Sequence, residues 1–91
     1  MNLQRQLNSV GKVIFVKYYY YFSDSNYYST EDVIKIIKEN YSEKSKKSRI
    51  SHAHMIFNNN LNVEALKIIL KSKVPEEIKQ QAQNILEEIS C

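Results

Sequence analysis

The sequence predicts a mostly α-helical fold, a small bundle of four to five short helices in a single domain over residues 1–91. Glycine and proline are scarce, with one of each, whereas β-sandwiches and barrels need frequent turn residues. Apolar residues recur at helical spacing in several separate stretches. A chain this short buries only about two thirds of the surface of its unfolded form, so we expect a modest core.

Residues 1–22 fit two templates. Residues 13–22 are dense in β-branched and aromatic side chains, which is typical of a strand, and Gly11 weakens a helix interior by about 1 kcal/mol relative to Ala. A strand needs a neighbour, however, and only the short pair Tyr27 and Tyr28 follows. We therefore favour a helix, with a hairpin or an intermolecular strand pairing as the alternative. The apolar stripe of this helix would consist of Leu3, Leu7, Val10, Ile14, Tyr18 and Tyr21.

The next helix has a clear start. Ser29 and Asp32 resemble a capping box in which Asp replaces the usual Glu or Gln, and Glu31 suits the positive end of the helix. We expect this helix to end near Asn40. Residues 41–47 are polar and lack an apolar period, which predicts a loop or a frayed first turn.

Three further helices are expected downstream. An apolar stripe begins at Ile50, and its helix should stop in the run of three asparagines at 58–60. Asn62 is expected to cap the following helix, which is apolar over most of its circumference. Pro75 lies in the first turn of the last helix, which carries a regular apolar stripe. The short linker 71–74 predicts that the last two helices form an antiparallel hairpin.

The charge is unevenly distributed along the chain. The formal net charge is +3, yet residues 29–61 carry six Lys or Arg against four acids, and residues 75–91 carry one Lys against four Glu. We interpret the two regions as complementing each other within the fold or across a homodimer. The single cysteine, Cys91, excludes a disulfide scaffold, and no signal peptide or membrane span is recognisable, so we expect an intracellular protein in the cytoplasm of its cell or host.

Motifs for catalysis or cofactor binding are missing from the sequence. A glycine-rich nucleotide loop needs more than Gly11. His52 and His54 lie two apart, and on a helix such residues diverge by about 200°, which separates them as metal ligands. The terminal Cys91 is a poor nucleophile for a preorganised site. We therefore expect no enzymatic activity, no metal, no cofactor and no small-molecule substrate.

Two clusters remain as binding candidates. The first is a basic cluster with interspersed serines, which suits contacts to nucleic-acid phosphates, although a helix-turn-helix would need a shorter turn. This cluster comprises Lys44, Lys46, Lys47, Arg49 and His52. The second is tyrosine-rich, and its consecutive rings cannot all face one core, so at least two should lie at the surface or in an interface. These candidates for partner binding are Tyr18, Tyr19, Tyr20, Tyr21, Tyr27 and Tyr28.

The aromatic cluster favours a protein partner, because Tyr is enriched in binding hot spots and stacking of bases usually needs a basic groove. We therefore expect a small macromolecule-binding protein, a regulator, inhibitor or assembly factor, with a second copy of the chain as one candidate partner. The small size and the AT-rich residue usage suit a phage, virus or mobile element. The alternative is a DNA- or RNA-binding regulator that uses the basic cluster from Lys44 to Arg49.

Overall fold

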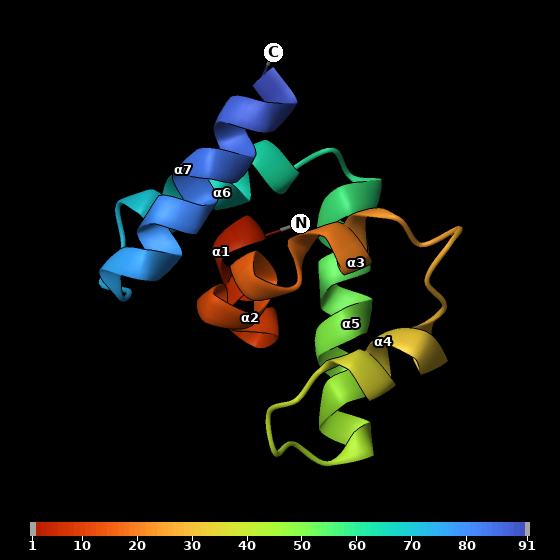
Figure 1. The fold of residues 1–91 in the computed structure, drawn as a ribbon. Helices are drawn as coiled ribbons and strands as arrows, with labels where there is room; N and C mark the ends of the chain where they lie inside the picture. The colour runs from red at the N-terminus through yellow and green to blue at the C-terminus, as the bar shows by residue number, and fades with distance from the viewer. Residues whose placement is uncertain (1, 91) are drawn as a thin grey trace.

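The predicted helical class is confirmed. A computed structural model describes residues 2–90, which form seven helices and no strand (Figure 1). The helix count exceeds the expected four to five because the N-terminal segment is divided into three. The helices are α1 (Leu3–Val10), α2 (Lys12–Lys17), α3 (Tyr19–Ser23), α4 (Thr30–Ile36), α5 (Glu43–Asn58), α6 (Asn62–Leu70) and α7 (Glu76–Ser90).

Two residues divide the N-terminal segment. Gly11 has φ 94° and ψ 124°, and its N–H donates to the carbonyl of Leu7 at 2.9 Å, so α1 ends there. Tyr18, with φ −113° and ψ 24°, separates α2 from α3. The segment is helical, as favoured, but the chain changes direction at each break. The stripe that one straight helix would carry is thereby distributed over three short helices, of which α1 and α3 pack on α5 and α2 packs on α7.

The capping box at the start of α4 is confirmed. The Ser29 hydroxyl accepts from the N–H of Asp32 at 3.2 Å, and the Asp32 carboxylate accepts from the N–H of Ser29 at 3.1 Å. The helix ends at Ile36 rather than near Asn40. Ile37 adopts an extended conformation and is 2% exposed, so the early end of α4 allows Ile37 to enter the core.

For residues 41–47 the sequence left two alternatives open, a loop or a first helical turn, and the loop is confined to residues 41–42 while the first turns of a helix follow from Glu43. Helix α5 begins at Glu43, and the Ser42 hydroxyl caps it by accepting from the N–H of Ser45 at 3.1 Å. The first turns of α5 lack an apolar stripe because polar side chains, rather than apolar ones, join them to the rest of the fold. The predicted end of this helix is confirmed at Asn58.

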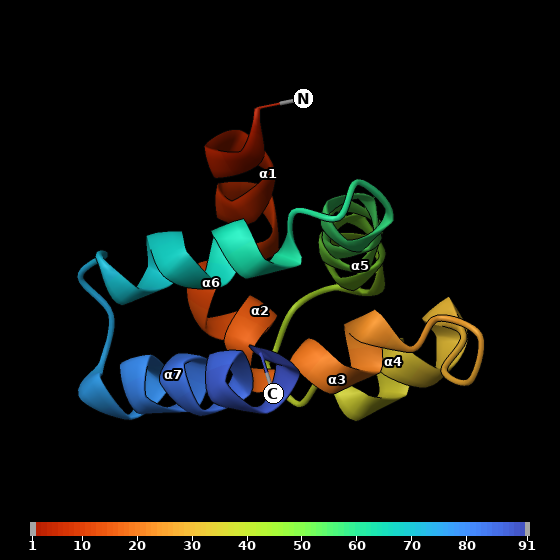
Figure 2. The ribbon, with the colours of Figure 1, turned by 90° about the horizontal axis from the view of Figure 1, so that it is seen from above.

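Helix α6 begins without the expected side-chain cap. Asn62 is its first residue, and no side-chain cap is present, so the capping role predicted for Asn62 is wrong. The Asn62 amide instead donates to the Tyr19 hydroxyl at 2.8 Å, which requires a neighbour distant in sequence. Helix α7 begins directly after Pro75, whose carbonyl accepts from the N–H of Lys79 at 3.1 Å. The expected α6–α7 hairpin is present, with the two helices side by side (Figure 2).

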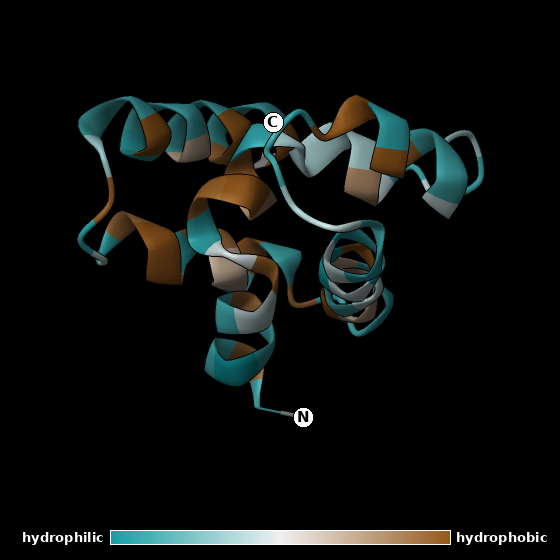
Figure 3. Cartoon of the chain, turned by 90° about the horizontal axis from the view of Figure 1, so that it is seen from below, coloured by the Kyte–Doolittle hydropathy of each residue, from teal (hydrophilic) through white to brown (hydrophobic). Residues whose placement is uncertain are grey.

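The core lies where these helices meet. Helix α1 packs along α5, α2 packs against α7, and α3 and α4 both pack against α5. Apolar residues line the inner side of α7 while its outer side is polar (Figure 3). The fully buried side chains include Phe15 and Phe22 from the N-terminal segment, together with Ile50, Ile56 and Leu66. Within residues 2–90, no helix combines the length and the hydropathy needed to cross a membrane.

Candidate interaction surface

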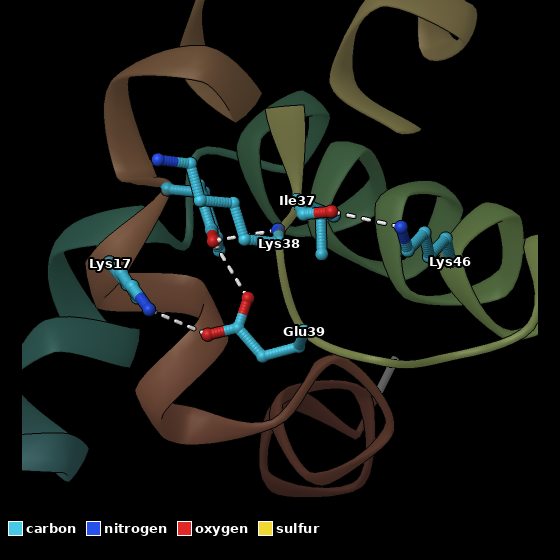
Figure 4. Close-up of polar contacts among 6 residues, drawn as sticks. Lys17, Ile37, Lys38, Glu39 and Lys46 are labelled. Atoms are coloured by element: carbon cyan, nitrogen blue, oxygen red, sulfur yellow. Dashed lines mark hydrogen bonds and ion pairs between the residues drawn. The ribbon is translucent and has the colours of Figure 1, made fainter. Parts of the chain in front are cut away.

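Tyr18 belongs to the core. It is 5% exposed, and its hydroxyl donates to the Glu39 carboxylate at 2.7 Å and accepts from the N–H of Lys38 at 3.1 Å. Burial raises the pKa of Tyr18. Lys17 approaches the other Glu39 oxygen at 2.7 Å, and this contact, followed by the Tyr18 hydrogen bond, lowers the pKa of Glu39 (Figure 4). These contacts attach the segment after α4 to the junction of α2 and α3.

Tyr19 is also a core residue, 3% exposed. Its ring meets Phe15 and Phe57 at centroid distances of 5.6 and 5.0 Å, both in edge-to-face geometry. The hydroxyl is satisfied by Asn62, and burial raises the pKa of Tyr19. Neither Tyr18 nor Tyr19 offers a ring face to a partner in this structure.

Tyr20 points to the surface and is 48% exposed. Its hydroxyl donates to the carboxylate of Glu88 on α7, and this hydrogen bond is the main reason that the pKa of Tyr20 rises to about 12. The ring lies at one side of a groove of about 210 Å³ between α2–α3 and α7. The groove is lined by Val16, Lys17, Tyr20, Gln81, Asn84 and Ile85. Sequence reasoning missed this groove because its two sides are separated by more than sixty residues.

Three tyrosines form a continuous aromatic surface, which we call the tyrosine patch: Tyr21, Tyr27 and Tyr28. The ring centroids of Tyr21 and Tyr28 are 4.9 Å apart at an interplanar angle of 78°, and those of Tyr27 and Tyr28 are 4.7 Å apart at 75°. Tyr27 is 73% exposed, whereas Tyr21 and Tyr28 are partly buried. The patch therefore consists of two partly buried rings, Tyr21 and Tyr28, and one exposed ring, Tyr27.

The turn that carries the patch is held by Asp24. Its carboxylate and its backbone carbonyl both accept from the N–H of Tyr27, at 3.2 and 3.1 Å. The same carbonyl accepts from the N–H of Tyr28 at 2.9 Å. Asp side chains are frequent in turns because they accept such local backbone bonds. The turn is therefore defined by local hydrogen bonds before any partner arrives.

The predicted basic cluster lies on α5, and two of its members make contacts within the chain. Lys46 donates from Nζ to the carbonyl of Ile37 at 2.9 Å (Figure 4). The same Nζ donates to the carbonyl of Ile34 at 3.3 Å, so both contacts lie at the C-terminal end of α4. Arg49 donates from Nη1 to the carbonyl of Val10 at 2.7 Å. Lysine beside the last carbonyls of a helix is a favourable arrangement, since those carbonyls carry partial negative charge.

The remaining members of the cluster differ in exposure. Lys44 and Lys47 are exposed on the outer face of α5. His52 is partly buried, and its Nδ1 is hydrogen bonded to the side-chain oxygen of Gln6 on α1. Of the five residues predicted as an anion-binding cluster, two are exposed cations, while the other three make hydrogen bonds that join α5 to its neighbours.

His52 and His54 do not form a metal site with other ligands. No group of three or more His, Cys, Asp or Glu side chains that could hold a metal occurs among residues 2–90. His54 is partly buried, and its Nε2 has no hydrogen-bond partner among residues 2–90. Burial lowers the pKa of His54. Cys91, weighed as a ligand and as a nucleophile, lies outside the described residues.

Two ion pairs stand out among the described residues, and they join Lys17 to Glu39 and Lys67 to Glu64. Neither of these two pairs joins an acidic residue of α7 to a lysine of α5. The interpretation that the acidic and basic regions complement each other, within the fold or across a homodimer, therefore draws no support from these two contacts.

In comparisons with known proteins, the chain matches no protein-family model, no curated protein and no solved structure.

Proposed function

We propose that this chain is a non-enzymatic protein-interaction module that contacts its partner through the tyrosine patch. The observation that carries the proposal is the position of Tyr27, which is 73% exposed although its backbone is held in an ordered turn. Of the exposed large apolar side chains, Tyr27 has the largest exposed fraction. The Tyr27 ring contacts the partly buried Tyr28 ring, which in turn contacts the Tyr21 ring.

The physical basis is preorganisation. Binding normally costs the conformational entropy of the side chains and loops that become ordered at the interface. Tyrosine has few rotatable bonds, a large apolar ring and a hydroxyl that tolerates water, so it contributes contact area at a low entropic cost. In the tyrosine patch the ring contacts and the turn hydrogen bonds made by Asp24 already restrict the rings. A partner would meet a surface that needs little further ordering.

The nucleic-acid alternative has weaker support. Contacts to phosphate need accessible cations, and Lys46 and Arg49 already donate to backbone carbonyls of α4 and α1. Lys44 and Lys47 remain on the outer face of α5. Stacking of single-stranded bases on the tyrosine patch would require a basic groove beside the rings, yet residues 18–34 contain no Lys, Arg or His.

A binding role also suits the chemistry of the polar groups. The groups with shifted pKa values include Tyr18, Tyr20 and Glu39, and their hydrogen bonds join one helix or segment to another. Catalytic carboxylates need environments that separate their pKa values within one cleft. We therefore propose no reaction, no cofactor and no metal for this chain. The use of a single cysteine is consistent with the proposed location inside the cell.

The proposal is tested by affinity capture from a lysate of the cells that produce the protein, with and without nuclease. Wild type is compared with Tyr27→Ser, and Met55→Ser serves as the matched control because Met55 is also exposed, at 41%, but lies on α5. We expect defined protein bands that survive nuclease, persist with Met55→Ser and are lost with Tyr27→Ser. Bands that persist with Tyr27→Ser, or that disappear with nuclease, would contradict the proposal.

A further inference from the structure

We propose that the tyrosine patch recognises a cationic segment of its partner protein, with arginine side chains lying on the tyrosine rings. This inference rests on the proposed function and specifies the chemistry of the partner. It draws on three features of the described residues: the charge around the patch, the relative orientation of its rings, and a contact of the same kind inside the fold.

The segment that carries the patch is negatively charged although the whole chain is positive. Residues 18–34 contain three carboxylates and no Lys, Arg or His, whereas the formal net charge of the chain is +3. Asp24, Glu31 and Asp32 are all exposed. Asp24 and Asp32 accept backbone hydrogen bonds at the turn and at the start of α4. A cationic segment is therefore attracted to this surface and an anionic one is repelled.

The rings themselves favour a cation. The face of an aromatic ring carries partial negative charge, and a guanidinium or ammonium within about 6 Å of the centroid is attracted to it. Tyr28 stands at 78° to Tyr21 and at 75° to Tyr27. Because the planes are nearly perpendicular, the ring faces point in different directions. With Tyr27 73% exposed, a cation that approaches the patch can reach the face of a ring.

The fold already contains a contact of this kind. The guanidinium carbon of Arg49 lies 4.0 Å from the centroid of the Tyr41 ring. Arginine is well suited to this arrangement because its planar guanidinium stacks on aromatic rings and is more weakly hydrated than an ammonium. Lys17 also lies over a tyrosine ring, with its Nζ 5.6 Å from the centroid of Tyr18, but the Arg49 contact is closer. We therefore assign arginine, rather than lysine, as the preferred side chain of the partner.

A second copy of the chain is the less favourable source of that cation. The chain has two arginines, and Arg49 is held by the Val10 carbonyl and the Tyr41 ring. A second copy would have to use Arg5 or exposed lysines, such as Lys44 and Lys47 of α5. We therefore assign the segment to a different protein.

The experiment uses short fluorescent peptides as probes. One peptide alternates arginine with glycine and serine, and the matched peptide replaces each arginine by citrulline, which has nearly the same shape without the charge. Backbone amide shifts of 15N-labelled protein report where each peptide binds, and fluorescence anisotropy reports how tightly. We expect the arginine peptide to shift the amide signals of Tyr27 and Tyr28. We expect the affinity of the citrulline peptide to be at least about fivefold lower.

Two protein variants separate the ring contribution from the charge contribution. Tyr27→Leu keeps an exposed apolar side chain but removes the ring, and Glu31→Gln removes one carboxylate without touching the capping box. Both variants should bind the arginine peptide more weakly than the wild type does, and Glu31→Gln should also reduce the salt dependence of this binding. The matched control is Glu43→Gln, because Glu43 is an exposed acid in the first turn of α5. This control should leave the affinity unchanged.

Each contrary result has a definite meaning. Equal binding of the citrulline peptide at Tyr27 and Tyr28 would overturn the cationic partner while leaving the protein-binding function in place. Shifts confined to the acidic residues of α7, or no shifts at all, would overturn this inference, whereas the capture experiment judges the function separately. Concentration-dependent shifts of both Tyr27 and Lys47 without any peptide would overturn the assignment to a different protein in favour of a second copy.

Discussion

Arg49 on α5 donates a 2.7 Å hydrogen bond from Nη1 to the carbonyl oxygen of Val10, the last residue of α1. The contact joins residues 39 apart in the sequence and lies directly beside Gly11. Its geometry depends on that glycine, because a Cβ added at Gly11 would lie 2.9 Å from Nη1 of Arg49. The junction between α1 and α2 is therefore both a backbone turn and a docking point for α5.

Gly11→Ala should destabilise the protein by about 1 to 3 kcal/mol, because φ of 94° is unfavourable for a residue with a Cβ and because the Cβ crowds Arg49. The free energy of unfolding measured in urea checks this. Ser48→Ala, at an exposed position of α5, is the control and should change stability by less than about 0.5 kcal/mol. A similarly small effect of Gly11→Ala would show that the turn adapts.

Neighbouring lysines on α5 should respond differently to the same substitution. Lys46→Gln removes the donor to the carbonyls of Ile34 and Ile37, so we expect a loss of about 1 to 2 kcal/mol in the free energy of unfolding. Lys47→Gln changes an exposed side chain and should cost less than about 0.5 kcal/mol. Equal effects of the two variants in urea denaturation would argue against a role of Lys46 in holding α4.

Duplex DNA binding provides a direct check on the alternative function. We expect no tight binding by the wild type at physiological salt, because Lys44 and Lys47 are too few to neutralise many phosphates. Anisotropy of a labelled duplex over a range of salt concentrations measures this. A submicromolar affinity of the wild type would instead favour DNA binding. If the double variant Lys44→Glu with Lys47→Glu then weakened it and lowered the slope of log K against log salt by about 0.9 per lost contact, the DNA-binding alternative would replace the proposed function.

Stability should fall on mild acidification because of His54. Burial lowers its pKa below 6.5 in the folded protein, so the unfolded chain takes up a proton more readily between that lowered pKa and 6.5. The contribution of His54 is then fully present above pH 6.5 and is lost as the pH falls towards the folded pKa. Urea denaturation at pH 7.5 and pH 5.5 should show a smaller difference for His54→Gln than for the wild type. An identical difference would exclude His54 as the cause.

Glu39 acts in a lower pH window. Its pKa is held below 4.5, first by the Lys17 contact and then by the Tyr18 hydrogen bond. The resulting stabilisation is therefore present above about pH 4.5 and is lost as the pH falls through the lowered pKa. In Glu39→Gln this acid-dependent part should disappear, so its stability curve below pH 4.5 should be flatter than that of the wild type. Parallel curves would contradict the assignment.

Two tyrosines of the aromatic segment should have opposite roles. Tyr19→Ser empties a core position that is 3% exposed and removes the partner of Asn62, so we expect a loss of about 3 to 5 kcal/mol. Tyr27→Ser alters a ring that is 73% exposed and should cost less than about 0.5 kcal/mol. Thermal unfolding of both variants checks this. A large loss with Tyr27→Ser would make the tyrosine patch a structural cluster.

Local signals predicted the elements that local interactions create. The capping box at Ser29, the end of α5 at Asn58 and the start of α7 after Pro75 each depend on residues within about one helical turn, and all three are present. Helical periodicity likewise predicted the helical class, because it reflects the one face of each helix that can be buried. These features could be read from the sequence without knowing any neighbour.

The candidate site was predictable only as a composition. The tyrosine run required some rings at the surface, but the sequence alone does not separate the buried Tyr19 from the exposed Tyr27. That separation depends on the chain reversals at Gly11 and Tyr18, which orient α3 so that Tyr19 faces Phe57. Likewise, neither the capping role expected of Asn62 nor the position of Lys46 in the polar segment 41–47 indicated that these side chains would contact a distant residue.

The sequence by itself therefore determined the helical class, the capping box at the start of α4 and the presence of surplus tyrosines and lysines. The tertiary structure alone decided which of them are available to a partner, because availability depends on contacts between distant residues. Arg49 and Lys46 hold α5 against α1 and against the end of α4 by donating hydrogen bonds to backbone carbonyls there. Tyr27 remained outside because its turn, held by Asp24, leaves the packed core.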